Sequence, residues 1–264
     1  MKEISVIIPV YNSSDSLNNL FERLNSVMKH ISSDYEIIFV NDASVDNSYK
    51  ILKQISMNNE NIKCIDLNKN FGQHNALLCG IRNASYDIIV TLDDDLQNPP
   101  EEIPKLINKI DEGYDVVYGY PNEEAHGFFR NIASILIKMV LKNIMGISTA
   151  RHVSSFRVFR KDLRNAFSNY EGSFVSIDVL LSWGTNSFSA IKVNHAKRKH
   201  GKSNYNFRTL LNHALNMITG FSVLPLRVAS IIGFLLAIFG LFILFYVLGR
   251  YFLHGSPVPG FPFL

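Results

Sequence analysis

TLDDDLQNPP, from Thr91 to Pro100, places three carboxylates between a predicted strand and a predicted helix. A β-rich apolar run, Tyr86–Val90, precedes it, and two prolines with an acidic pair follow as a helix start. In open α/β sheets ligands bind at the carboxyl ends of strands, where clustered like charges are costly unless a cation neutralises them. The stretch therefore predicts either a Mg²⁺ or Mn²⁺ site or a solvated acidic turn that caps the next helix.

Upstream of this stretch, apolar runs alternate with amphipathic segments. Strands are predicted at 4–10, 35–40, 62–67 and 86–92, and helices at 17–31, from 46 or 47 through 55, and at 75–83. Repeated β-α-β units at this spacing imply an α/β fold with a mostly parallel central sheet and right-handed crossovers. The strand-end loops then share one sheet edge, which brings Tyr11, Asp42 and the loop at 70–75 beside the acidic stretch.

Composition narrows the class of protein. The 264 residues carry a formal net charge of +3, which gives no sign of a nucleic-acid-binding surface. Cys64 and Cys79 show no metal-ligand spacing and are expected to stay reduced as core residues. The run Ile4–Val10 is too short for a secretory signal and is interrupted by Pro9.

The C-terminal part is an apolar tail without charged residues from Val228 to Gly249. Because roughly 20 such residues cross a bilayer, we predict a transmembrane helix over 227–252, with a buried core helix as the alternative. Basic residues crowd the sequence before the tail, so the positive-inside rule places the N-terminal domain, 1–206, in the cytoplasm and the helix in the cytoplasmic (inner) membrane. Residues 253–264 are expected to be an extracytoplasmic loop of a longer protein.

Two further segments are predicted to contact the membrane. Residues 128–144 fit an interfacial helix, although ordinary core packing is a close alternative. Residues 207–226 fit an amphipathic juxtamembrane helix that leads into the tail. Exposed apolar helices of this kind also make a homo-oligomer possible.

Eight motifs stand in a fixed order along the chain: IPVYN, VNDASVDNS, NFGQHNALLCGI, LDDDLQNPPE, SFRVF, RKHGKSNY, PLR and PVPGF. Together they resemble glycosyltransferase family 2, and in particular its membrane-attached, dolichyl-phosphate mannose synthase-like subgroup. The resemblance implies a GT-A-type nucleotide-sugar-binding domain, a divalent metal and inversion at the anomeric carbon. It also implies a polyprenyl phosphate acceptor, such as undecaprenyl phosphate, and a role in cell-envelope polysaccharide biosynthesis.

The resemblance assigns expected roles residue by residue. It implies substrate contacts at Pro9, Tyr11, Asn12, Asp42, Gly72, Asp93, Arg157, Arg198, Lys202, Ser203 and Tyr205. Asp42 is expected to accept a hydrogen bond from a uracil or thymine imide, and Tyr11 to lie against the base. The chain departs from the family pattern beside Asp42, where Asn41 replaces an Asp and Ala43 replaces a Gly.

Asp93 and Asp95 match the family's metal-linked pair. On extended backbone alternate side chains point the same way, so these two can face one ion while Asp94 turns aside. Gln97 matches a position near the sugar or the acceptor phosphate, where the resemblance implies a catalytic role. The alternative for Gln97 is a hydrogen bond to backbone at the helix entry.

Basic residues are expected to supply the other half of the site. Arg157, Arg198 and Lys202 match positions where the family meets phosphates, and a guanidinium suits bidentate phosphate binding. The stretch from Arg198 to Tyr205 is predicted to close over the diphosphate. A polybasic segment held to anionic lipid, at about 1 kcal/mol per charge, is an equally weighted alternative.

The residues that would act as a general base depart from the family. His152, Ser154 and Ser155 stand where dolichyl-phosphate mannose synthases carry acidic residues. A phosphate acceptor, with a second pKa of about 6, is already mostly dianionic and needs no strong base. Otherwise the role moves to Asp178, a carboxylate in a mostly apolar segment, for which capping or pairing with a cation is the alternative.

We therefore predict a membrane-anchored glycosyltransferase that transfers a sugar from a nucleotide sugar to a polyprenyl phosphate. The sequence leaves the sugar and the nucleotide open. One alternative is transfer to a hydroxyl of a lipid-linked glycan. The other is a non-catalytic, membrane-tethered binder of nucleotide sugars.

Overall fold

The computed structural model describes residues 2–121, 152–172, 174–196, 220 and 224–255. The chain divides into two compact units, Met1–Ala214 and Leu215–Leu264. The predicted interfacial helix at 128–144, the basic stretch at 198–205 and most of the predicted juxtamembrane helix at 207–226 lie outside the described residues.

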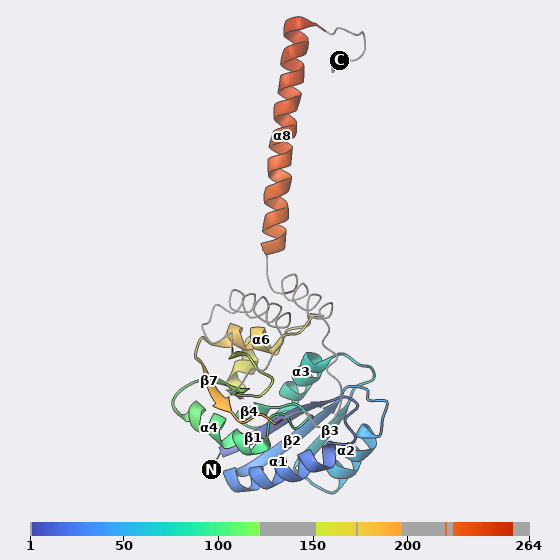
Figure 1. Cartoon of the computed structure of the whole chain (residues 1–264), viewed down its shortest axis with the longest axis vertical. Helices are drawn as coiled ribbons and strands as arrows, with labels where there is room; N and C mark the ends of the chain where they lie inside the picture. The colour runs from blue at the N-terminus through green and yellow to red at the C-terminus, as the bar shows by residue number, and fades with distance from the viewer. Residues whose placement is uncertain (1, 122–151, 173, 197–219, 221–223, 256–264) are drawn as a thin grey trace. The chain divides into compact units, whose positions relative to one another are not determined.

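The first unit alternates strands and helices over most of its length (Figure 1). Its elements are β1 (Lys2–Val10), α1 (Leu17–Ile31), β2 (Ser32–Asn41), α2 (Ser48–Met57), β3 (Ile62–Asp66), α3 (Gln73–Asn83), β4 (Ile88–Thr91), η1 (Pro100–Glu102), α4 (Ile103–Asp111), β5 (Val116–Pro121), β6 (Arg157–Arg160), η3 (Lys161–Phe167), α6 (Ile177–Gly184) and β7 (Phe188–Val193).

Seven strands form one sheet in the order β3-β2-β1-β4-β6-β5-β7. The first four pair in parallel, as do β5 and β7, whereas β6 runs antiparallel to both of its neighbours. The predicted α/β fold with a mostly parallel sheet is therefore confirmed. Because β1 to β4 are parallel, the loops that follow them lie along one edge of the sheet, as predicted.

The sheet is buried on both faces, which explains the continuous apolar runs of its central strands. On one face Ile4, Val6 and Ile8 of β1 join the core side chains of α1, α2 and α4 in one cluster. On the other face α3 lies close to the sheet at Gly80, where a Cβ would stand 2.4 Å from Cγ2 of Ile7. The sheet therefore forms the middle of three layers.

Two predicted boundaries are corrected by local hydrogen bonds. Helix α3 begins at Gln73 instead of residue 75, because the N–H groups of Asn75 and Ala76 donate to the Gly72 carbonyl at 3.0 and 3.1 Å. Strand β4 begins at Ile88 instead of residue 86, because the Tyr86 N–H donates to the side-chain hydroxyl of Ser5 on β1, at 3.1 Å, instead of continuing the backbone ladder.

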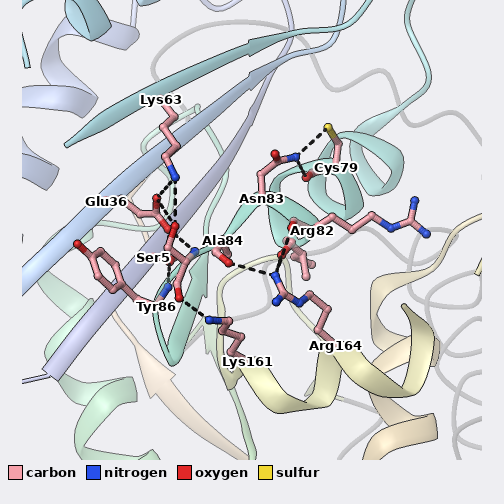
Figure 2. A network of polar contacts seen from close by, with 12 residues as sticks. Ser5, Glu36, Lys63, Cys79, Arg82, Asn83, Ala84, Tyr86, Lys161 and Arg164 are labelled. Carbon is pink, nitrogen blue, oxygen red and sulfur yellow. Dashed lines mark hydrogen bonds and ion pairs between the residues drawn. The ribbon is translucent and has the colours of Figure 1, made fainter. Parts of the chain in front are cut away.

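A buried carboxylate, Glu36, joins three strands near their amino ends (Figure 2). Its Oε1 accepts from the Ser5 hydroxyl and the Ser85 N–H, both at 2.6 Å, and its Oε2 lies 2.6 Å from the Lys63 ammonium. Burial raises the pKa of Glu36, but the bonds from Lys63, Ser5 and Ser85 outweigh burial and leave the pKa below its ordinary value. The network fixes an ionised carboxylate among β1, β2, β3 and the segment before β4.

The end of α3 is held by cations from η3 (Figure 2). One guanidinium nitrogen of Arg164 donates to the carbonyls of Ile81, Arg82 and Ala84 at 3.3, 3.2 and 3.1 Å. The last carbonyls of a helix lack the N–H partner that the next turn would supply, although the Ala84 N–H also donates to the Ile81 carbonyl at 3.3 Å. A cation at this end also complements the helix dipole.

The second unit contains α8, Leu224–His254. Its segment Leu226–Leu253 is, among the residues that the structure describes, the one helix long and apolar enough to cross a membrane. A core helix of a folded domain would be mostly buried, whereas the apolar window of α8 is not buried in the protein. The interpretation of the tail as a buried core helix is therefore not supported.

Candidate active site

The loops after β1 and β2 are tied to each other at the carboxyl edge of the sheet. The Asn12 N–H donates to the Ser44 hydroxyl at 3.0 Å, and the Asn12 side-chain oxygen accepts from the Val45 N–H at 2.8 Å. Asn12 and Ala43 both have left-handed backbone, with φ of 53° and 54°. Asparagine adopts this conformation readily, whereas the Cβ of an alanine makes it costly.

Asp42 attaches the loop before α3 to this pair of loops. Its Oδ1 accepts from the Phe71 N–H at 2.7 Å and its Oδ2 from the Gly72 N–H at 2.8 Å, while its own N–H donates to the Val10 carbonyl. Gly72 has φ of +88°, a conformation that favours glycine. A carboxylate oxygen that accepts one hydrogen bond has a second lone pair with which it can accept another. The bond from a nucleobase to Asp42 stays a prediction.

Asp93 and Asp95, the expected metal pair, have different surroundings. The Asp93 carboxylate accepts from the Gln73 amide at 2.6 Å and from the Ser155 hydroxyl at 2.5 Å. Oδ1 of Asp95 accepts from the Gln97 N–H at 3.0 Å, which closes a turn before η1. Both side chains are half-buried, so neither is sealed in the core.

Asp94 is bonded to the loop after β1 and to the start of α1. Its Oδ2 accepts from the Tyr11 N–H at 3.2 Å, and its carbonyl accepts from the Ser16 hydroxyl at 2.8 Å. Burial raises the pKa of Asp94 to about 6, against the opposing effect of hydrogen bonds from Ser13 and Tyr11. Asp94 thus ties the acidic loop to the loop after β1, and its turning aside from a bound ion stays a prediction.

Gln97 connects the acidic loop to the chain beyond β7. Its carbonyl accepts from the Ala196 N–H at 2.8 Å, and the Asn194 amide donates to the buried carboxylate of Glu102 at 2.8 Å. Ala196 is the last described residue before the basic stretch. The predicted phosphate contacts Arg198, Lys202, Ser203 and Tyr205 lie outside the described residues.

Arg157 and Asp178, expected to serve substrate and catalysis, form a buried ion pair with each other. Their exposed fractions are 1% and 5%, and the Tyr118 hydroxyl donates to Asp178 at 3.0 Å. Pairing of Asp178 with a cation was the alternative interpretation, and it is confirmed. Nε of Arg157 is buried without a hydrogen-bond partner in the part of the chain that the structure describes. The predicted contacts of Arg157 and Asp178 with substrate stay predictions.

The donor set at the acidic loop fits a hard divalent cation. Within the described ranges no group of three or more His, Cys, Asp or Glu side chains is placed to enclose an ion. Mg²⁺ is commonly held by one or two carboxylates, with substrate phosphates and waters completing its coordination. Asp93 and Asp95 match that smaller protein contribution.

Residues 5–167, more than half of the chain, match the glycosyl transferase family 2 domain. The chain belongs to glycosyl transferase family 2. As a family 2 glycosyltransferase it has the GT-A-like α/β domain, and the loops described above surround the carboxyl edge of that domain. The family does not by itself specify the acceptor.

Solved structures share the family 2 fold. Glucosyl-3-phosphoglycerate synthase from Mycobacterium tuberculosis, in complex with Mn²⁺, uridine diphosphate and phosphoglyceric acid, superposes with a TM-score of 0.60 at 16% identity, covering 82% of this chain and 76% of that one. TarS 1–349 from S. aureus gives 0.52 at 18%, covering 84% and 73%. Mannosyl-3-phosphoglycerate synthase from Rubrobacter xylanophilus gives 0.60 at 13%, covering 83% and 73%. Identities this low show a shared fold alone.

Sequence reasoning missed that Gln73 and Ser155 of this family 2 glycosyltransferase both contact Asp93. Both lie in quoted motifs, NFGQH and SFRVF, but neither motif indicates that they reach the same carboxylate. Their meeting depends on the antiparallel pairing of β6 with β4, in which Arg157 lies opposite Thr91. No rule of strand periodicity predicts that pairing.

Proposed function

We propose that this glycosyltransferase transfers a sugar, with inversion, from a nucleoside-diphosphate sugar to a polyprenyl phosphate at the cytoplasmic face of the inner membrane. The observation that carries the donor half is the pair Asp93 and Asp95 at the carboxyl edge of the sheet, on a loop bonded to the loop after β1. The observation that favours a lipid acceptor is the apolar helix α8 in the same chain.

The donor would bind along the strand-end loops. Tyr11, with its side chain 48% exposed, is available to lie against a base, and Asp42 holds the neighbouring loop in place. Asp95, with Asp93, would hold Mg²⁺ or Mn²⁺, which when bound neutralises charge on the departing diphosphate. The Mn²⁺ and uridine diphosphate in the glucosyl-3-phosphoglycerate synthase structure support this choice of donor and metal.

The remaining predicted contacts belong to the same proposal. Pro9, Asn12 and Gly72 would shape the donor site, with Gln97 near the sugar or the acceptor phosphate. Arg198, Lys202, Ser203 and Tyr205 would meet phosphates, and this placement is supported by the bond between the Ala196 N–H and the Gln97 carbonyl. Arg157 would contribute through its unpartnered Nε.

The environment of Asp178 supports a phosphate acceptor. A hydroxyl acceptor needs a group that takes its proton, whereas a phosphate dianion attacks without one. Asp178, the carboxylate that could serve as base, already balances the charge of buried Arg157 and accepts from Tyr118. A phosphate acceptor is already negatively charged and needs no base, so it is compatible with an Asp178 that is paired with Arg157.

The acceptor can be identified by product mass. Membranes that contain the full chain are incubated with Mg²⁺ or Mn²⁺, undecaprenyl phosphate and each of several nucleotide sugars, and the lipids are analysed by mass spectrometry. We expect one donor to give a sugar-phosphate lipid. Extension of a lipid-linked glycan instead would show a hydroxyl acceptor, and nucleotide binding without any product would show a non-catalytic binder.

Asp178→Asn separates the two acceptors further. Transfer to a phosphate should continue in this variant, whereas transfer to a hydroxyl should stop if Asp178 is the base. Because Asp178 balances a buried guanidinium, the variant's melting temperature is measured beside its turnover, and turnover is compared only while the protein is folded.

A further inference from the structure

The three residues Phe71–Gln73 bind two carboxylates that follow different strands. The backbone N–H groups of Phe71 and Gly72 donate to Asp42, after β2, and the Gln73 side chain donates to Asp93, after β4. The positive φ of Gly72, +88°, gives the turn between these two contacts. We call this segment the 71–73 bracket.

Asp93 is held on its other side by a second element. Its Oδ2 accepts from the Ser155 hydroxyl at 2.5 Å, while Oδ1 accepts from Nε2 of Gln73 at 2.6 Å. The Ser155 carbonyl in turn accepts from the Thr91 hydroxyl at 2.7 Å, which fixes the segment before β6 against the end of β4. Each oxygen of Asp93 therefore has its own side-chain donor, one from the start of α3 and one from the segment before β6.

We propose that Gln73 and Ser155 are positioning residues that orient Asp93 for the divalent cation of the donor complex. The inference rests on the proposed function, because it assigns how one of the two expected metal-linked carboxylates is prepared. The 71–73 bracket would then connect Asp42, where the nucleobase is expected to bind, with Asp93, where the metal is expected to bind.

The chemistry of the two donors supports this role. An amide and a hydroxyl are neutral, so they orient the carboxylate without cancelling the negative charge that attracts a cation. Donors of this kind behind a metal-linked carboxylate typically contribute about 10- to 100-fold to metal affinity.

The core does not explain these contacts. Gln73 is exposed at the first position of α3, and the bond to Asp93 is its one side-chain hydrogen bond among the described residues. Burial therefore gives no reason for Gln73 to hold Asp93. Loss of an exposed amide is expected to leave the free energy of unfolding nearly unchanged, within about 0.5 kcal/mol, so metal affinity and stability can be separated.

The test measures Mn²⁺ affinity in the full chain, purified in detergent. Electron paramagnetic resonance reports free Mn²⁺ during a titration at a saturating concentration of UDP, or of GDP or dTDP if the wild type prefers one of these. The variants are Gln73→Ala, Ser155→Ala and the conservative Ser155→Thr. Gln54→Ala, an exposed glutamine on α2, is the matched control. Melting temperature is recorded for each protein.

We expect Gln73→Ala and Ser155→Ala each to weaken Mn²⁺ binding by about 10- to 100-fold. Ser155→Thr keeps the hydroxyl and should restore binding, and Gln54→Ala should bind as the wild type does, with melting temperatures unchanged throughout. Wild-type Mn²⁺ affinity in both alanine variants overturns the inference while leaving the proposed function intact. Absence of Mn²⁺-dependent nucleotide binding in the wild type overturns both.

Discussion

Replacing Glu36 with glutamine tests how the central strands are held together at their amino ends. Glu36 is 4% exposed, and each of its oxygens has a defined set of donors. Oε1 accepts from the Ser5 hydroxyl and the Ser85 N–H, whereas Oε2 accepts from Lys63 and, at 3.3 Å, from the Ser85 hydroxyl. A glutamine can place its oxygen where Oε1 stands. Its NH₂ group then replaces Oε2 and faces the Lys63 ammonium, to which it cannot offer an acceptor.

The magnitude follows from these contacts. Hydrogen bonds to a charged group contribute about 1.5–3 kcal/mol and neutral ones about 0.5–1.5, so the two bonds to Oε1 together weaken by about 2 kcal/mol. The Lys63 side chain is 47% exposed and can turn to water, so its lost ion pair adds no more than about 1 kcal/mol. We expect Glu36→Gln to lower the free energy of unfolding by about 2–3 kcal/mol at pH 7.

Urea unfolding of the full chain in mild detergent, followed by the fluorescence of Trp183, measures this difference. Trp183 is the single tryptophan and packs edge-on against Tyr170 in the first unit. Glu112→Gln is the control, because Glu112 forms an exposed ion pair with Lys109 that solvent screens and that should contribute little to stability. Equal unfolding midpoints for the two variants would contradict the importance of the Glu36 network.

The pH dependence has a defined sign. The pKa of Glu36 is lowered in the folded protein, so its contribution is present above the ordinary value of 4.5 and is lost as pH falls through the folded pKa. The gap between wild type and Glu36→Gln should therefore be constant near neutral pH and shrink below about pH 4.5. A gap that widens as the pH falls would refute the assignment of an ionised Glu36.

Backbone and charge around Asp42 give further predictions. Ala43→Gly relieves a left-handed alanine (φ 54°) and should raise the free energy of unfolding by up to about 1 kcal/mol, whereas Gly72→Ala (φ +88°) should lower it by about 1–2 kcal/mol, both measured by urea unfolding. Shifts of the opposite sign would contradict the backbone assignment. Asn41 donates to Asp66 at 2.7 Å, so Asn41→Asp sets two carboxylates together. It should lower the free energy of unfolding by about 1–3 kcal/mol at pH 7, and stability equal to the wild type would exclude charge repulsion at this position.

The parts of the fold that local sequence pattern predicts are those with a strong burial pattern. The stripe of α1, with Leu17, Leu20, Leu24 and Met28 buried, repeats at the helical period. Strands β1 and β2 are visible as continuous apolar runs, because the sheet is buried on both faces. Parallel order then places their loops on one edge.

The parts that the sequence does not predict depend on contacts between distant segments. The pairing of β6 between β4 and β5 brings Ser155 to Asp93 across 62 residues, and no local pattern encodes it. The ion pair of Arg157 with Asp178 is also invisible locally, because each residue alone resembles a site residue and only their contact shows the charge to be balanced. Asp42 likewise holds a loop whose N–H groups lie 29 and 30 residues away.

The comparison of Asp95→Asn with Asp162→Asn tests the proposed function most directly. Asp162 is exposed in the first turn of η3 and serves as a matched control outside the acidic loop. With the donor that gives a sugar-phosphate lipid, we expect Asp95→Asn to reduce turnover by about 100-fold or more and Asp162→Asn to leave it unchanged. Turnover in Asp95→Asn equal to that of the control would contradict a metal-assisted transfer at the acidic loop.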